Sequence, residues 1–383
     1  MLQGRRVDDE RLVGGDDDEV GVRAHGDPSL AGQPGHVCGA GRGPGHHVGE
    51  VVAANDELFA DRRHLVSPGP SVWDPTTYGP DGKVYDGWET RRRRGPLGAL
   101  PGPDEHDHAV VRLGAPGTVR RVVVDTAHFT GNYPASASVE GLRAGDHADL
   151  AALESSSWTP LVPRSPIAGD TANVFDVAAD GVFTHVRLRI YPDGGVARLR
   201  VLGHVRPDPR FLEGTVDLVA AQNGGHVVGC SDRFYSSPSN LLLPGVATTV
   251  GGGWETARRR VEGNEWVDVA LGVPGVPRVL EIDTTQYVGN PPGAARLRGA
   301  DLRGADLRTG WSGNGDDPRV SVELVPLSPL LPDTVHRFRV RDHLADVPVV
   351  SHVRLDIHPD GGVNRLRLLG EAEADGAAGP ARR

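Results

Sequence analysis

The chain has 383 residues, a formal net charge of −10 and only two cysteines. Such an acidic chain lacks the basic surplus of proteins that bind a phosphate backbone, and two cysteines cannot build a disulfide framework or a cysteine-based zinc site. No apolar run is long enough to span a bilayer, and residues 1–20 are charged rather than signal-like. We therefore expect a soluble, cytoplasmic protein of two domains with no nucleic-acid or membrane partner.

The N-terminal segment differs in composition from the rest of the chain. Residues 1–47 are rich in Gly, Asp and His and show little periodicity. Such a segment cannot bury enough apolar surface to offset its ordering entropy. We expect either a disordered extension or the product of a misassigned start.

The rest of the chain contains a tandem duplication. Four blocks recur in the same order, which is the signature of repeat architectures. The pairs are VVAANDELF (51–59) and VVGCSDRFY (227–235), GWETRRR (87–93) and GWETARR (253–259), DTAHFTGN (125–132) and DTTQYVGN (283–290), and HVRL followed by PDGGV (185–196 and 352–363). We place the first repeat at 48–206 and the second at 212–371, joined by a stiff Pro-Asp-Pro linker and followed by a disordered tail at 372–383.

Each repeat has the pattern of β-strands. Apolar and polar residues alternate through 186–191, a Pro-Asp-Gly-Gly turn follows, and alternation resumes at 198–201, which predicts a hairpin. Further strands are predicted at 119–125 and 276–283, and no segment has a convincing helical period. Short strands between Gly- and Pro-rich turns predict an all-β protein built as two tandem jelly-roll or similar β-sandwich repeats.

The two repeats differ at their beginnings. The second repeat opens with DLVA at 217–220, before the strand that begins near Val227. The first repeat has no similar string ahead of Val51. We therefore expect the first repeat to lack an opening edge strand.

Two strings carry a resemblance to a known family. DGWETRRRR (86–94) and HFTGNYP (128–134) resemble signatures of the allantoicase family, whose two-repeat layout is also similar. The resemblance covers 48–371 and is specific, because the strings are long and unusual in composition. It implies galactose-binding-like jelly-roll modules and the hydrolysis of allantoate to ureidoglycolate and urea in purine catabolism.

The implied substrate defines what a site must contain. Allantoate carries one carboxylate and two ureido groups on one carbon, so releasing urea breaks a carbon–nitrogen bond at that carbon. The reaction needs a cationic clamp, a general acid, a general base and hydrogen-bonding groups for the ureido arms. Arginine binds carboxylates through a planar fork, and on a strand Arg91 and Arg93 would share one face. We assign both to substrate binding; the alternative is a solvated arginine row.

Glu89 recurs as Glu255 and is the predicted catalytic carboxylate. It could act as a base, as an acid or as a salt-bridge partner, and neighbouring arginines should lower its pKa and disfavour the acid role. The adjoining Asp86 and Trp88 are predicted substrate-binding residues. Asp86 has no acidic counterpart, since Gly252 occupies the equivalent position.

His128 is the predicted proton carrier, because histidine titrates near neutral pH. Asp125 is assigned to catalysis with it, and Asn132 to hydrogen bonding with a ureido group. The second-repeat counterparts of the two latter residues are Asp283 and Asn290, whereas Gln286 replaces the histidine. The alternative is that these side chains only organise a turn.

No cofactor or metal site is predicted, although a divalent cation is not excluded. His106 and His108 are closely spaced, but His108 aligns with Trp266. Cys230 is expected to be a small buried apolar residue.

A homo-oligomer acting on a small molecule is expected. The alternative functions are a non-catalytic sandwich that binds a small ligand and an allantoicase inactivated by a damaged N-terminus.

Overall fold

The computed structural model describes residues 36–38, 49–67, 69–79, 82–145, 148–303 and 321–373. Apart from His36–Cys38, the predicted N-terminal extension lies outside the described residues, as does the predicted tail from 374 onward. The described regular structure is almost entirely β, with α1 (Leu150–Ser155) as its short α-helix. None of the described helices is both long and apolar enough to cross a membrane.

The first repeat is built around one long strand. Its strands are β1 (His36–Cys38), β2 (Glu50–Ala54), β3 (Tyr78–Gly79), β4 (Gly82–Lys83), β5 (Trp88–Glu89), β6 (Asp107–Asp125), β7 (Ser136–Leu142), β8 (Thr159–Pro166), β9 (Ala172–Asp176), β10 (Phe183–Tyr191), β11 (Gly195–Val196) and β12 (Arg198–Val205). Two 3₁₀ helices, η2 (Arg62–Val66) and η3 (Pro96–Gly98), lie in its loops.

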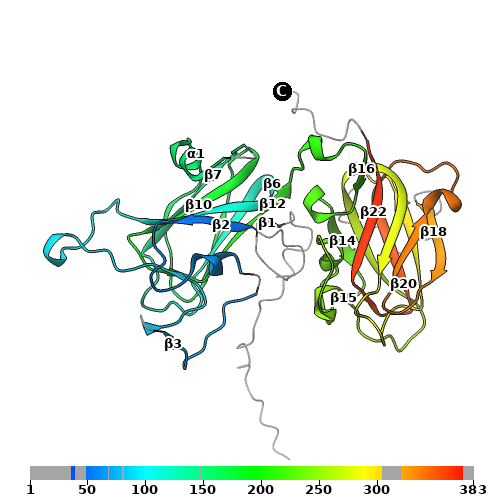
Figure 1. Ribbon diagram of the computed structural model, residues 1–383, viewed down its shortest axis with the longest axis horizontal. Helices are drawn as coiled ribbons and strands as arrows, with labels where there is room; N and C mark the ends of the chain where they lie inside the picture. Colours follow the sequence, from blue (N-terminus) through cyan, green and yellow to red (C-terminus); the bar gives the residue numbers. More distant parts are fainter. Residues whose placement is uncertain are drawn as a thin grey trace, which may run out of the picture. The chain divides into compact units, whose positions relative to one another are not determined.

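Strand β6 belongs to both layers of a sandwich. Its first part pairs with β2 and β10, and its last part pairs with β9 and β12. The pairing with β10 jumps from Arg112 to Gly117, so the strand passes from one layer to the other through a glycine- and proline-containing segment. One layer is therefore β2-β6-β10-β7-β8 and the other is β9-β6-β12-β1. Figure 1 labels β2, β6, β7 and β10 of the first layer and β1 and β12 of the second.

The predicted hairpin between 186–191 and 198–201 is wrong. Both segments are strands, but β10 and β12 pair with different parts of β6 and not with each other. The turn between them crosses from one layer to the other, and its backbone pairs instead with β5, Gly195 opposite Glu89 and Val196 opposite Trp88. The reason is that a tight-turn sequence specifies a change of direction and not the partner of the next strand.

The second repeat has the same topology. Its strands are β13 (Thr215–Asp217), β14 (His226–Cys230), β15 (Trp254–Glu255), β16 (Glu265–Asp283), β17 (Ala294–Ala300), β18 (Val322–Pro329), β19 (Val335–Arg339), β20 (Val350–His358), β21 (Gly362–Val363) and β22 (Arg365–Ala372). The linker contains the 3₁₀ helix η4 (Pro209–Phe211). The 3₁₀ helices of the second repeat are η5 (Ala221–Asn223), η6 (Pro238–Leu242), η7 (Val250–Gly252) and η9 (Val340–Asp342). The order β13-β22-β16-β20-β17-β18 repeats β1-β12-β6-β10-β7-β8. The predicted all-β fold of two tandem sandwich repeats is confirmed.

The first repeat has an opening strand, contrary to the expectation from its sequence. Strand β1 pairs with β12 in antiparallel fashion, His36 opposite Leu202, as β13 pairs with β22, Asp217 opposite Leu369. Strand pairing uses backbone N–H and C=O groups, so an edge strand can be present without a recognisable string.

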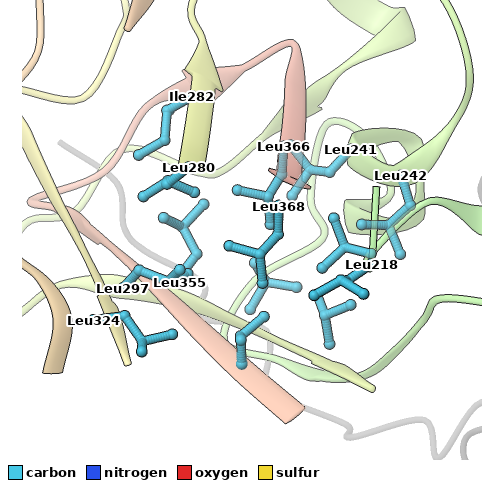
Figure 2. Close-up of a cluster of buried hydrophobic side chains, with 14 of the residues drawn as sticks. Leu218, Leu241, Leu242, Leu280, Ile282, Leu297, Leu324, Leu355, Leu366 and Leu368 are labelled. Carbon is cyan, nitrogen blue, oxygen red and sulfur yellow. The ribbon is translucent and has the colours of Figure 1, made fainter. Parts of the chain in front are cut away.

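Each repeat has its own apolar core, which holds the site-bearing strands. In the second repeat, leucine and isoleucine side chains of both layers interdigitate, among them Leu280, Ile282, Leu355 and Leu366 (Figure 2). Each such fully buried side chain contributes roughly 1.5–3 kcal/mol of hydrophobic free energy. Short strands at the sandwich end, such as β5 and β15, are therefore carried by rigid scaffolds.

Candidate active site

Strand β5 places Glu89 at the end of the first sandwich. The residue before it, Trp88, is fully buried, and its indole N–H donates to the Asp56 carbonyl oxygen at 2.7 Å. The substrate contact predicted for Trp88 is not available in this structure, because its side chain has no exposed surface. Trp88 instead anchors β5 and thereby positions Glu89.

Glu89 and Asn132, which are both predicted site residues, contact one another in the structure. The Asn132 amide donates to Glu89 Oε1 at 2.8 Å. Burial raises the pKa of Glu89, and this outweighs the lowering by the Asn132 hydrogen bond and by the charge of Arg92. The direction is opposite to that expected from the neighbouring arginines, because desolvation cannot be seen in a string of residues. A carboxylate with a raised pKa is a stronger base.

Tyr85 completes this group and was not identified from the sequence. Its ring stacks on Phe129 at 4.8 Å between centroids and contacts Trp73 at 5.2 Å. Its phenol interacts with Asn132, while burial and the Glu89 charge raise the pKa of Tyr85, so it stays a neutral hydrogen-bond donor. The only available signal was its position directly before the DGWETRRRR string.

His128 lies at the same end of the first repeat. It adopts a left-handed backbone conformation (φ 70°), and its N–H donates to Asp170 Oδ1 at 2.7 Å. Its Nε2 is 3.1 Å from the Ser71 carbonyl oxygen, and its ring stacks on Trp73 at 5.8 Å. The same indole is contacted by the Lys83 Nζ, 3.6 Å from a ring centroid of Trp73. A carbonyl partner makes Nε2 the protonated nitrogen.

Asp125 and Asp86 organise the loops around this group. Asp125 Oδ1 accepts the Ala127 N–H at 2.9 Å, which is a turn contact. Asp86 accepts the Val72 N–H at 2.8 Å and the buried Arg198 guanidinium at 2.7 Å. Burial alone would raise the pKa of Asp86, but these two hydrogen bonds bring it below its usual value. Both predicted site residues therefore have structural partners.

Arg91 and Arg93, the predicted carboxylate clamp, are engaged with acidic side chains. Arg91 bonds the Asp56 carboxylate, and Arg93 Nη2 donates to Asp107 Oδ1 at 2.6 Å. Each ion pair ties the arginine segment to a different strand or loop of the sandwich. These contacts compete with any role in binding the substrate.

Arg92 is the arginine whose charge acts on Glu89. Strict alternation of side chains along a strand would place Arg92 on the face opposite Arg91 and Arg93. In the structure, β5 ends at Glu89, and the residues that follow are not part of a strand. Side chains therefore no longer alternate strictly. Arg92 is exposed and becomes the candidate clamp in the first repeat.

The second repeat reproduces the central pair. The Asn290 amide donates to Glu255 Oε1 at 2.7 Å. The scaffold contacts also recur, since Arg259 Nη1 donates to Glu265 Oε1 at 2.6 Å, in the place of the Arg93 pair. Asp283 Oδ1 accepts the Thr285 N–H at 2.7 Å, which is the same turn contact as in the first repeat.

The imidazole of His128 and the phenol of Tyr85 do not recur. Gln286 shares the left-handed conformation (φ 74°), and its N–H donates to Asp333 Oδ1 at 2.9 Å, so only the imidazole is missing. Gly251 occupies the position equivalent to Tyr85. The buried Tyr287 hydroxyl donates to the Val250 carbonyl oxygen at 2.6 Å and is thereby engaged.

Among the described residues, no group of three or more His, Cys, Asp or Glu side chains is arranged to hold a metal ion. The His106 and His108 rings lie 6.1 Å apart and are tilted. Cys230 is half-buried, and burial raises the pKa of its thiol, which disfavours the reactive thiolate.

Comparison with known proteins agrees with the two-repeat architecture. The family model described as allantoicase repeat matches residues 45–206 and 216–373. A protein of Nocardia farcinica named probable allantoicase is 50% identical over 327 residues, covering 84% of this chain and 91% of its own length. One of Streptomyces coelicolor, with the same name, is 47% identical over 334 residues, covering 86% and 84%. The crystal structure of allantoicase from Saccharomyces cerevisiae matches with a TM-score of 0.70 at 31% identity, covering 88% of this chain and 92% of that one.

Proposed function

The chain belongs to the allantoicase family, and from this premise we propose that it hydrolyses allantoate to ureidoglycolate and urea at the end of its first repeat. The observation that carries the choice of site is the contact of Glu89 with Asn132 beside Tyr85. The alternatives, a non-catalytic sandwich or a chain with a damaged N-terminus, are not favoured. The family match spans both repeats, and the first repeat has its opening strand.

The chemistry follows from the bond that breaks. Water adds its oxygen to the central carbon and loses a proton to Glu89, whose raised pKa makes it a fitting general base. The carbon–nitrogen bond breaks, its electron pair stays on the ureido nitrogen, and His128, in its doubly protonated form, delivers its Nδ1 proton there while Nε2–H stays on the Ser71 carbonyl oxygen. Urea leaves, and the proton held by Glu89 restores His128. Atoms and charge balance without another reactant.

The other side chains bind and orient the substrate. Asn132 has its Nδ2 on Glu89, which leaves its Oδ1 to accept a ureido N–H. The neutral Tyr85 phenol donates to a ureido carbonyl, and Arg92 binds the carboxylate. Trp73 holds the imidazole of His128 against the site by stacking. Holding the reacting atoms at fixed distances lowers the entropic part of the barrier.

We assign turnover to the first repeat because two of these groups are absent from the second. Gln286 cannot carry a proton, and Gly251 has no side chain to donate. We also propose that the reaction needs no metal, that it takes place in the cytoplasm and that the chain forms a homo-oligomer. The exposed arginine segment and the paired repeats support the last point.

The test is urea release from allantoate by the purified full-length protein, with and without EDTA. We expect release at a rate typical of enzymes and unchanged by EDTA. Absence of release from folded protein would contradict the proposed activity. Loss of release under EDTA, restored by a divalent cation, would contradict the metal-free mechanism alone. Light scattering of the same sample measures the oligomeric state.

A further inference from the structure

The second repeat retains a glutamate–asparagine pair that turnover in the first repeat does not require. The Glu255–Asn290 distance is 2.7 Å, against 2.8 Å for Glu89–Asn132, although the residues around the two pairs differ. An exposed arginine, Arg258, stands three positions after Glu255, as Arg92 does after Glu89. Folding of the second repeat alone does not require a glutamate–asparagine pair and an exposed arginine at the end of a loop.

The pair is held from several sides. The Trp254 indole N–H donates to the Asp232 carbonyl oxygen at 3.0 Å, which fixes the strand that carries Glu255. The backbone N–H of Glu255 itself donates to Ser236 Oγ at 2.8 Å. The Asn290 carbonyl oxygen accepts the N–H of Gly362 at 2.8 Å. Both side chains therefore start from fixed backbone positions.

Two acceptor atoms of the pair are left for a ligand. Asn290 uses its Nδ2 on Glu255 Oε1. In the part of the chain that the structure describes, neither Glu255 Oε2 nor Asn290 Oδ1 has a hydrogen-bond partner. A planar ureido group presents two N–H donors side by side, which matches two neighbouring acceptors.

The surroundings are suited to binding and not to proton transfer. Gln286 and Gly251 stand where the first repeat has a histidine and a tyrosine. On the loop that holds β15, the Phe234 and Tyr235 rings are exposed by 72% and 63% and contact one another edge to face at 4.8 Å. Both rings lie within two residues of Ser236, whose Oγ accepts the Glu255 N–H, and exposed aromatic rings provide flat surfaces for a planar ligand.

We propose that the second repeat carries its own ligand site, built from Glu255, Asn290 and Arg258, which binds a ureido carboxylate without hydrolysing it. Glu255 Oε2 and Asn290 Oδ1 accept the ureido N–H groups, and Arg258 pairs with the carboxylate. The chemical class of the ligand rests on the proposed function. The chain then holds two molecules of this class and turns over one.

The experiment counts bound ligand in a protein whose first site is disabled. Full-length Glu89→Ala/Asn132→Ala protein is titrated with allantoate by calorimetry, and urea is assayed in the cell afterwards. We expect one equivalent bound and no urea. Adding Glu255→Ala/Asn290→Ala should abolish the binding, whereas adding Glu323→Ala, an exposed glutamate on β18, should leave it unchanged. Circular dichroism verifies folding of every variant.

Two outcomes would overturn the inference: no binding to the first double variant, or binding that survives in the quadruple variant. The Glu255→Ala/Asn290→Ala variant alone should keep its urea release within about two-fold of wild type, because its first site is intact. Failure of the proposed function would look different, since wild-type protein would then release no urea.

Discussion

The two repeats share a scaffold and differ in the lengths of several connections, including the one that precedes β5. Both have the same strand order and the same Glu–Asn pair. The connection that precedes β5, residues 60–86, is longer than its counterpart at 236–252. Trp73, Lys83 and Tyr85 all lie in this connection; Trp73 stacks on His128, and Tyr85 contacts Trp73. The comparison indicates that duplication supplied the frame and the Glu–Asn pair, and that this connection, together with His128, distinguishes the first repeat.

The same connection explains a difference in buried charge. Arg198 and Arg365 occupy equivalent buried positions, but among the described residues only Arg198 has a carboxylate partner, Asp86. Arg365 donates to the Gly245 and Gly252 carbonyl oxygens, and burial lowers its pKa to about 10. The carboxylate of the first repeat both neutralises an arginine and fastens the longer connection to β12.

Replacing the equivalent glutamates, Glu89 and Glu255, should reveal the largest difference in activity between the two repeats. Glu89→Gln removes the general base and should lower kcat for urea release by about 1,000-fold. Glu255→Gln should leave kcat within about two-fold of wild type. Steady-state assays of both variants provide the measurement. Equal losses in the two variants would contradict the assignment of turnover to the first repeat.

The Asp86–Arg198 pair should contribute measurably to the stability of the first repeat. Asp86→Asn leaves a buried guanidinium without its counter-charge and should reduce the free energy of unfolding by about 3 kcal/mol. Thermal or urea denaturation measures this loss. Asp74→Asn, which changes an exposed carboxylate of the same connection, is the control and should cost much less stability. Similar losses for both variants would show that the buried pair has no special role.

Replacing His128 by its second-repeat counterpart tests its catalytic role without a folding defect. Gln286 already adopts the same left-handed backbone (φ 74° against 70°), so Gln is tolerated there. His128→Gln should lower kcat by about 100-fold, with an unchanged melting temperature. The reciprocal Gln286→His should change neither quantity. An unaffected kcat in His128→Gln would transfer the role of acid to another group, with Tyr85 as the first candidate.

The smallest expected effect is a change in pH dependence. Glu89 acts as a carboxylate, so activity falls as the pH drops through its raised pKa. The charge of Arg92 lowers that pKa, so Arg92→Ala should move the acid limb of kcat to higher pH, by less than about one unit for an exposed charge. Arg258→Ala is the matched control and should leave the profile unchanged. A shift to lower pH would contradict this arrangement of charges.

Sequence alone determined the duplication and the all-β class, and it indicated candidate site residues. Repeated strings and alternating apolar residues depend only on order along the chain, and burial on one face of a sheet enforces that order. Glu89 and Asn132 were identified because their strings recur as those of Glu255 and Asn290.

The tertiary structure decided which elements meet and how charges behave. The pairing of β10 and β12 with β6, and the presence of β1, depend on backbone contacts between distant segments. The proximity of Tyr85 to Asn132 and the raised pKa of Glu89 also depend on which segments meet in the folded chain. Periodicity encodes which side of a strand is buried, but it contains no information on distances through space or on the water excluded from a carboxylate.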